Sequence, residues 1–339
     1  MPSIDIAIPN YNYGRYLGAC IASVLSQDGI DLRVLVIDNG SADESVSVAR
    51  AFARADRRVQ VRLRQTNVGP HASFNEAIDW ARADYFLMLC SDDLLVPGAL
   101  HRAIAVMEKN CDVAFVYGRD VQMRGNGPAP QVPPPPGPVP WSRMEGLDFI
   151  RRFCRLGVFQ IPGPTLVVRT AVQKRAGYYR SELPHSDDYD VWLRFATFGA
   201  VGAMDCVQAV NRRHADNRSG LFRNRQLLHI RHTAAAADCF FAHEGSRLPG
   251  AARLHRLARR SLAERAYWAA VSGFLRGQPA HELFSYAFHE QPRTALLPPV
   301  DYLLRRPDTR QRMIDYAGRL FTARRHRRAA AMRTAGGNK

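Results

Sequence analysis

Acidic and amide side chains follow apolar runs at two places in the first third of the sequence. Asp38 and Asn39 come directly after the run V-L-V-I, and Asp92 and Asp93 come shortly after the run Y-F-L-M-L. Adjacent carboxylates on a short turn repel each other, and a divalent cation with oxygen ligands relieves that repulsion. These residue types and their spacing therefore predict a site for a divalent metal ion.

A second acidic group, S-D-D-Y-D, spans residues 186–190 at the start of a segment with a helical pattern. A carboxylate at this place either serves as a general base or caps the helix and stabilises its positive end. Asp187 fits the capping role, and any of the three aspartates, Asp187, Asp188 or Asp190, could be the base.

The segments that must position these side chains alternate between strand and helix patterns over the first 120 residues. The expected strands are residues 4–9, 33–37, 59–63, 85–90 and 113–117, and the expected helices are residues 16–27, 42–55, 72–83 and 98–110. Such alternation predicts βαβ units around a mostly parallel sheet with helices on both faces. Ligands of open α/β sheets bind beyond the carboxyl ends of strands, where these acids lie.

The rest of the chain changes character twice. Residues 125–140 contain so many prolines that they predict a loop rather than a helix or central strand. Further helices are expected over residues 145–155, 187–198, 226–243, 251–276, 280–288 and 309–325, with one strand over residues 207–212. We place a boundary near residue 220, between a domain of residues 1–220 and a helical region of residues 221–339.

The net charge of +16 is confined to the C-terminal part of the 339 residues. Residues 1–211 contain 22 basic and 22 acidic side chains, whereas residues 212–339 contain 25 basic and 9 acidic ones. No apolar run is long enough to span a bilayer, and the N-terminus lacks the pattern of a signal peptide. The six cysteines are scattered without metal-binding spacing, as in a cytoplasmic protein with reduced thiols.

Several motifs occur together in one order over about the first 220 residues. They read I-P-N-Y-N-Y-G from residue 8, V-I-D-N-G-S-A-D from residue 36, N-V-G from residue 67, S-D-D from residue 91, D-D-Y-D-V-W-L-R from residue 187 and R-R-H-A-D-N from residue 212. In this order they resemble the family 2 glycosyltransferases. The resemblance implies the α/β GT-A fold, with a Rossmann-like, mostly parallel mixed sheet flanked by helices, ahead of the basic α-helical extension.

The resemblance also implies which residues bind a nucleotide-diphosphate sugar donor. Pro9, Tyr11 and Asp38 would line the pocket for the base. Asn12, Asn67, Ser91 and Arg213 would be further donor contacts, with Arg213 on the diphosphate. Asp92 would contact the ribose.

Asp93, the last acid of the DXD-type motif, would bind Mg²⁺ or Mn²⁺, which would bridge the diphosphate. His214 would complete the metal shell or contact the diphosphate, unless it is only a surface histidine. The general base that deprotonates an acceptor hydroxyl in an inverting reaction would be Asp188.

The expected function is thus an inverting, metal-dependent glycosyltransferase that extends a glycan or glycolipid in cell-surface polysaccharide synthesis. Its partners would be the donor, a glycan or lipid-linked acceptor and, through the basic region, the anionic inner face of the membrane. We expect no nucleic-acid partner, because no recognisable module accompanies the basic residues. The alternatives are a sugar-nucleotide nucleotidyltransferase, which would need a Gly-rich basic loop after the first strand, and a scaffold, which would not need the acids.

Overall fold

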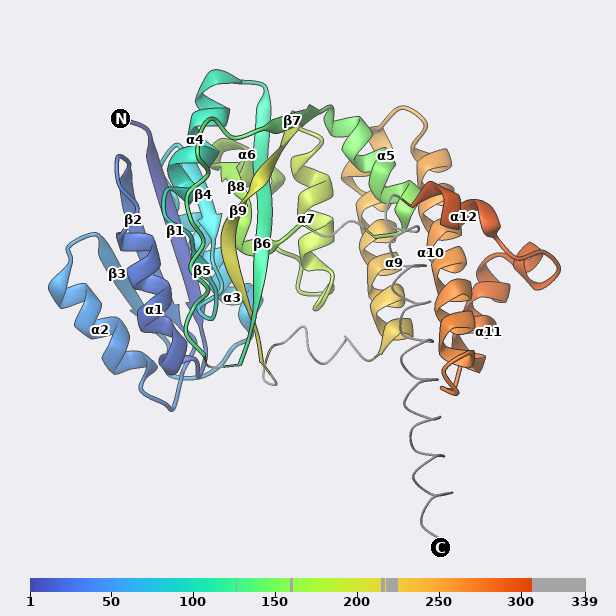
Figure 1. Ribbon diagram of the computed structural model, residues 1–339, viewed down its shortest axis with the longest axis horizontal. Helices are drawn as coiled ribbons and strands as arrows, with labels where there is room; N and C mark the ends of the chain where they lie inside the picture. The colour runs from blue at the N-terminus through green and yellow to red at the C-terminus, as the bar shows by residue number, and fades with distance from the viewer. Residues whose placement is uncertain (126, 159–160, 215–216, 218–224, 307–339) are drawn as a thin grey trace, which may run out of the picture. The chain divides into compact units, whose positions relative to one another are not determined.

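The computed structural model describes residues 1–306 except 126, 159–160, 215–216 and 218–224 (Figure 1). The chain divides into two compact units, Met1–Leu262 and the residues from Ala263 onward, with the division inside α10 (Ala251–Phe274). The boundary predicted near residue 220 falls among residues outside the description and remains a prediction. The helix predicted over residues 309–325 also lies outside it.

The described part of the first unit is built around one mixed sheet with the strand order β3-β2-β1-β4-β8-β6-β9-β5, in which β7 pairs with β9. The strands are β1 (Ser3–Asn10), β2 (Asp31–Asp38), β3 (Val59–Leu63), β4 (Tyr85–Met88), β5 (Leu94–Leu95), β6 (Val113–Arg124), β7 (Trp141–Met144), β8 (Val167–Arg169) and β9 (Ala200–Arg213). The long pairings β1–β2, β2–β3 and β6–β9 are parallel, whereas β8, β5 and β7 pair antiparallel with their neighbours.

Helices cover both faces of this sheet (Figure 1). They are α1 (Gly14–Leu25), α2 (Ser45–Ala55), α3 (Pro70–Trp80), α4 (Ala99–Lys109), α5 (Gly146–Leu156), α6 (Thr170–Ala176), α7 (Asp187–Phe195) and α9 (Gln226–Ala242). Helices α1, α2 and α4 contribute to one hydrophobic core, and α3, α5, α6, α7 and α9 contribute to the other. The fold is the α/β arrangement that the sequence predicts.

The strands at the centre supply both cores because successive side chains point to opposite faces of a sheet. In β1, Ile6 and Ile8 belong to the core with α1, whereas Ala7 between them belongs to the core with α3. In β2, Val36 and Ile37 divide in the same way. Burial on both faces explains why these strands are continuous apolar runs in the sequence.

Several elements differ from the expectation. Strands β6 and β9 extend well beyond residues 113–117 and 207–212, because they pair with each other in parallel up to Arg124 and Arg213. Strands β5, β7 and β8 and helix α6 were not expected, since segments this short carry no readable periodicity. The described residues of the Pro-rich stretch 125–140 form neither helix nor strand, as predicted.

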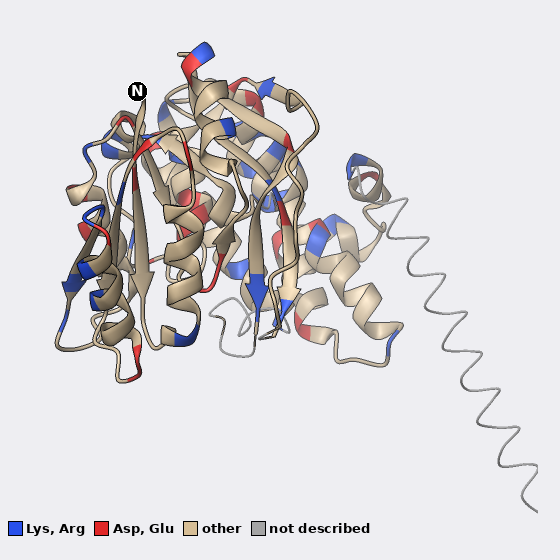
Figure 2. Ribbon diagram, turned by 60° about the vertical axis from the view of Figure 1, so that its left-hand side comes forward, with Lys and Arg blue, Asp and Glu red and all other residues tan. Residues whose placement is uncertain are grey.

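The second unit consists of the end of α10 followed by α11 (His281–Glu290) and α12 (Val300–Arg305). An ion pair between Arg305 and the buried Glu264 joins α12 to α10. Both signs of charge are spread over the described residues (Figure 2). Residues 307–339, which lie outside the description, contain nine basic and two acidic side chains, so much of the +16 charge lies there. No helix in the described residues has the length and hydrophobicity needed to cross a membrane.

Candidate active site

The parallel pairing of β1 and β2 places Asn10 opposite Asp38 at the carboxyl ends of both strands. The Asn10 amide donates a hydrogen bond to Oδ2 of the buried Asp38 at 2.9 Å. The Ser41 hydroxyl donates to the same oxygen at 2.6 Å, and the Ser41 backbone N–H donates to Oδ1 at 2.9 Å. Asp38 is therefore a fixed, fully hydrogen-bonded carboxylate at the edge of the sheet.

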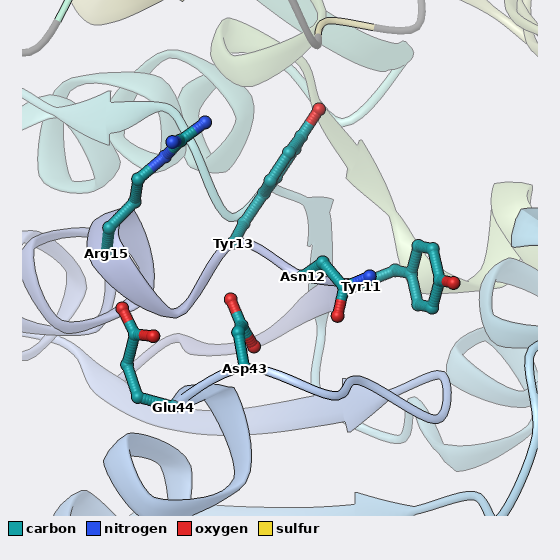
Figure 3. A pocket seen from close by; sticks show the side chains of 6 residues that line it. All are labelled: Tyr11, Asn12, Tyr13, Arg15, Asp43 and Glu44. Atoms are coloured by element: carbon teal, nitrogen blue, oxygen red, sulfur yellow. The ribbon is translucent and has the colours of Figure 1, made fainter.

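The turn after β1 is bonded to the turn after β2. Asn12 has a positive φ of 56°, its N–H donates to the Ser41 hydroxyl at 2.8 Å, and its Oδ1 accepts from the Ala42 N–H at 2.8 Å. Pro9 is half-buried in β1, and Tyr11 is exposed. In Figure 3 the Tyr11 ring lies on the opposite side of Asn12 from Arg15. A depression of about 500 Å³ is lined by Tyr11, Asn12, Tyr13, Arg15, Asp43 and Glu44.

Asn67, another predicted donor contact, is bonded to the turn after β2. Its Oδ1 accepts from the Asn39 amide at 2.7 Å and from the Gly69 N–H at 2.9 Å. The chain between them passes Gly40, which has a φ of 77° and would bring a Cβ within 2.7 Å of the Thr66 backbone. Only glycine fits there without strain, and the close approach keeps Asn67 at this edge of the sheet.

The acid pair is held by the end of β9. Strand β5 pairs antiparallel with β9, which brings Asp92 and Asp93 beside Arg212, His214 and Asn217. Oδ2 of Asp92 lies 3.1 Å from Nε2 of His214 and accepts from the Asn217 amide at 2.6 Å. Oδ1 of Asp93 accepts from the Arg212 N–H at 2.9 Å. The acid pair and the end of β9 are therefore neighbours, although they are more than 100 positions apart in the chain.

Burial dominates the electrostatics of this pair. Burial raises the pKa of Asp92, against the opposing effects of a hydrogen bond and positive charge from His214. Burial raises the pKa of Asp93 well above its usual range, and the nearby Asp92 carboxylate raises it further. The neighbouring Ser91 is buried, and the half-buried Arg213 opposes part of the Asp93 shift. Two buried carboxylates of this kind are more easily ionised when a cation joins them.

The second acidic group begins α7, and its three aspartates have different surroundings. Asp187 is buried with its Oδ2 3.1 Å from Nε2 of His71. Asp190 is fully buried in ion pairs with Arg180 at 2.7 Å and Arg194 at 2.8 Å. Asp188 is exposed. Among the three, Asp188 is the carboxylate that is exposed to substrate from outside.

Cys90 lies near both acidic groups. Its side chain is exposed, but enough protein surrounds the thiol that burial raises its pKa well above the usual value, with further contributions from Asp93, Asp92 and Asp188. The thiol is thus within electrostatic reach of the acid pair and of Asp188. Burial raises the pKa of Tyr179, and the Asp188 carboxylate raises it further, so Tyr179 also lies near Asp188.

Several residues of this region were not predicted from the sequence. Arg212 donates from its side chain to the Asp92 carbonyl oxygen at 3.1 Å and lies over the Tyr16 ring. Asn217 and His71 contact the acids directly. Arg212 and Asn217 flank His214 in the R-R-H-A-D-N motif, which was a usable signal. For His71 there was none, because only the packing of α3 near α7 brings it to Asp187.

The residues after β4 fit a divalent cation. Ligand atoms of Cys90, Asp92 and Asp93 all lie within 4.8 Å of one another. Protein donors engage one oxygen of each carboxylate, Oδ2 of Asp92 and Oδ1 of Asp93, which fixes their orientation. Burial raises the pKa values of both carboxyl groups, and a bound cation would stabilise their ionised forms. The ring of His214 contacts Asp92 and packs against Tyr13 and Tyr16.

A strand-end site with two groups of acids on a mixed α/β sheet is the arrangement of a nucleotide-sugar transferase. The model of the family described as "Glycosyl transferase family 2" matches residues 5–175, half of the chain. The chain therefore belongs to glycosyl transferase family 2. This confirms the sequence-based assignment to a glycosyltransferase family with the GT-A fold.

The chain aligns with only part of each of the following curated relatives. Chondroitin synthase of Pasteurella multocida is 30% identical over 219 residues, which are 65% of this chain and 21% of the synthase. An uncharacterized glycosyltransferase of Haemophilus influenzae is 34% identical over 110 residues, which are 32% of this chain and 44% of that protein. The chain thus aligns with less than half the length of these two relatives.

Solved structures share the fold over most of the chain. TarS 1–349 of S. aureus, in complex with UDP-GlcNAc, has a TM-score of 0.59 at 18% identity and covers 91% of this chain and 82% of its own. Mannosyltransferase PcManGT of Pyrobaculum calidifontis, in complex with GDP-Man and Mn²⁺, has a TM-score of 0.55 at 15% identity. The match covers 98% of this chain and 84% of the mannosyltransferase. At these identities the likeness defines the fold alone.

Proposed function

We propose that this chain transfers a sugar from a nucleotide-diphosphate donor to a hydroxyl group of a glycan or glycolipid, with a divalent cation and inversion at the anomeric carbon. One observation carries the proposal. The charges of the exposed Asp188 and of the buried pair Asp92 and Asp93 all raise the pKa of the Cys90 thiol. The candidate base and the candidate cation site therefore lie near the same thiol. Family membership supports the reaction class.

In this proposal the turns after β1 and β2 bind the nucleotide. Asp38 is already fixed by Asn10 and Ser41, so it presents a preorganised acceptor to the base, with Pro9 and Tyr11 beside it. Asn12 and Asn67 hold the rim of this pocket in place through their bonds to the second turn. Ser91 and Asp92 continue the contact surface toward the ribose.

Asp93 would hold the cation with the help of the neighbouring His214, and Arg213 would offer a positive charge to the diphosphate. When bound, Mg²⁺ or Mn²⁺ supplies Lewis-acid stabilisation of the charge that develops on the leaving diphosphate. Asp188 takes the proton of the acceptor hydroxyl as the oxygen attacks. Inversion requires attack from the face opposite the diphosphate, so the base must act from the side of the sugar away from the cation.

Related proteins support the acceptor, donor and cation named in this proposal. A chondroitin synthase and a hyaluronan synthase of Pasteurella multocida are both 30% identical over 219 residues, which favours a polysaccharide acceptor in cell-surface synthesis. TarS is complexed with UDP-GlcNAc, and PcManGT with GDP-Man and Mn²⁺, which favours a nucleotide sugar and a divalent cation here. We place the enzyme in the cytoplasm with peripheral contact to the anionic inner membrane surface, since the basic C-terminal residues complement such a surface.

The two alternatives have less support. A nucleotidyltransferase would need a Gly-rich, basic loop after the first strand, and the chain reads P-N-Y-N there. A non-catalytic scaffold would not need Asp92, Asp93 and Asp188 in one region.

Thermal unfolding of the full chain tests the proposal directly. Nucleoside diphosphates and nucleotide sugars are added with and without Mn²⁺ or Mg²⁺. A donor at about 100 times its Kd should stabilise the fold by about 2.7 kcal/mol, and only when the cation is present. Stabilisation by no nucleotide sugar, or equal stabilisation without cation, would overturn the proposal. Product analysis with the stabilising donor then gives the anomeric configuration.

A further inference from the structure

Large apolar side chains are exposed in and beside the connection between α11 and α12. Leu296, Leu297 and Val300 are 85%, 74% and 54% exposed, and Leu304 in α12 is 82% exposed. We call residues 296–300, L-L-P-P-V, the leucine loop. In Figure 1 this connection extends outward from the helices of the second unit. Adjacent exposed leucines are uncommon on a soluble surface and mark a place where apolar material docks.

The leucine loop is anchored at both ends. The Trp268 indole N–H in α10 donates to the Pro299 carbonyl oxygen at 3.0 Å. The Leu297 N–H donates to the Arg293 carbonyl oxygen at 3.0 Å. Thr294 before the loop and Tyr302 after it are buried. The leucines are therefore presented by a bonded turn, so inserting them elsewhere requires little additional ordering of the backbone.

Positive charge adjoins the loop on both sides in the sequence. Arg293 is exposed before it, and Arg306 ends the described structure after it. Residues 307–339 follow at once, with nine basic and two acidic side chains. The loop itself contains no acidic residue, and the exposed Asp301 that follows it is paired with Arg305 at 3.4 Å. An apolar tip next to such a basic segment complements a surface that is apolar inside and negatively charged outside.

We propose that the leucine loop inserts into an anionic lipid membrane, with Arg293 and Arg306 on either side of it facing the lipid phosphates. Stable peripheral attachment generally takes two signals, and the leucines and the flanking arginines supply one each. The inference rests on the membrane contact included in the proposed function and gives that contact a place in the chain. It does not depend on which sugar is transferred.

Vesicle flotation of the full chain tests it, with phosphatidylcholine vesicles and with vesicles that also contain about 30% phosphatidylglycerol. The test variant is Leu296→Ser with Leu297→Ser, and the control is Leu63→Ser, an exposed leucine of β3. Wild type and control should bind the anionic vesicles. The partition coefficient of the double variant should be at least about tenfold lower. Both leucines are exposed, so the variant should unfold at the same temperature as the wild type.

A second measurement reports insertion itself. Leu297→Trp should show blue-shifted emission with anionic vesicles and quenching by lipids brominated in the acyl chains. Equal binding of wild type and the double variant would overturn the role of the loop, while leaving an electrostatic contact intact. Absence of wild-type binding, or a concentration-dependent dimer that the double variant loses, would also overturn it. The donor-induced thermal shift judges sugar transfer separately in every case.

Discussion

Oδ2 of Asp187 lies 3.1 Å from Nε2 of His71, and this contact separates the roles of two adjacent aspartates. The contact ties Asp187 at the start of α7 to α3, whereas Asp188 is exposed on the same turn. On a helix, neighbouring residues point about 100° apart, so one carboxylate can support the fold while the next meets a substrate.

Replacing Asp188 should stop transfer without loss of donor binding. In Asp188→Asn the shape is kept but no base accepts the acceptor proton, so turnover should fall by about two to four orders of magnitude. Donor affinity, measured by the thermal shift, should stay near the wild-type value. Near-native turnover in this variant, with a large loss in Asp187→Asn, would assign the base to Asp187 instead.

Replacing Asp190 should weaken the fold rather than the chemistry. Asp190→Asn leaves the buried Arg194 without its charged partner, and breaking a buried ion pair costs about 3 kcal/mol or more. Urea denaturation measures the change. The matched control is Asp148→Asn, because Asp148 and Arg151 form an exposed pair on α5, and its loss should cost about 1 kcal/mol or less. Equal losses in both variants would contradict the structural role.

Replacing Asp93 should weaken the binding of a divalent cation. Asp93→Asn keeps the acceptor for the Arg212 N–H but lacks the negative charge that holds the cation. Calorimetric titration with Mn²⁺ should show at least about tenfold weaker binding. The control Asp148→Asn, which changes an exposed carboxylate on α5 in the same unit, should bind Mn²⁺ like the wild type. Unchanged affinity in Asp93→Asn would remove this residue from the cation site.

Cation binding should weaken as the pH falls, starting above the usual carboxylate range. Burial raises the pKa values of Asp92 and Asp93, so both hold protons at pH values where exposed aspartates do not. A cation binds the ionised pair and displaces those protons, so its affinity rises with pH until the raised pKa values are passed. Each proton displaced changes the apparent Kd by up to about tenfold per pH unit. A Kd that does not change with pH above the range in which exposed aspartates titrate would contradict the shifts.

Cys90 should react slowly with alkylating reagents although it is exposed. Its pKa is raised well above the usual value, chiefly by burial and then by Asp93, and only the thiolate reacts. Cys111, which is also exposed, provides the comparison within the same chain. Peptide mass spectrometry after timed alkylation at about pH 8 should show at least about tenfold slower modification of Cys90. Equal rates would contradict the electrostatic environment assigned to this thiol.

Long, buried elements were predictable from the sequence, and short ones were not. The runs of β1 and β2 are apolar on both faces, so each reads as a strand without knowledge of its neighbours. By contrast, β5 has two residues, Leu94 and Leu95, and exists because β9 pairs with it. That pairing decides the site, since it carries Asp92 and Asp93 to Arg212 and Asn217.

The sequence by itself determined the βαβ order, the family motifs and the strand ends that carry Asp38 and the acid pair, because each depends on local patterns. Tertiary structure decided which aspartate of residues 187–190 is exposed, since His71 comes from α3 and Arg180 from the segment before α7. It also decided that Cys90 lies within reach of both acidic groups, and that the leucines at 296 and 297 are exposed. Burial and electrostatic neighbours arise from contacts distant in the chain, and residue order does not specify them.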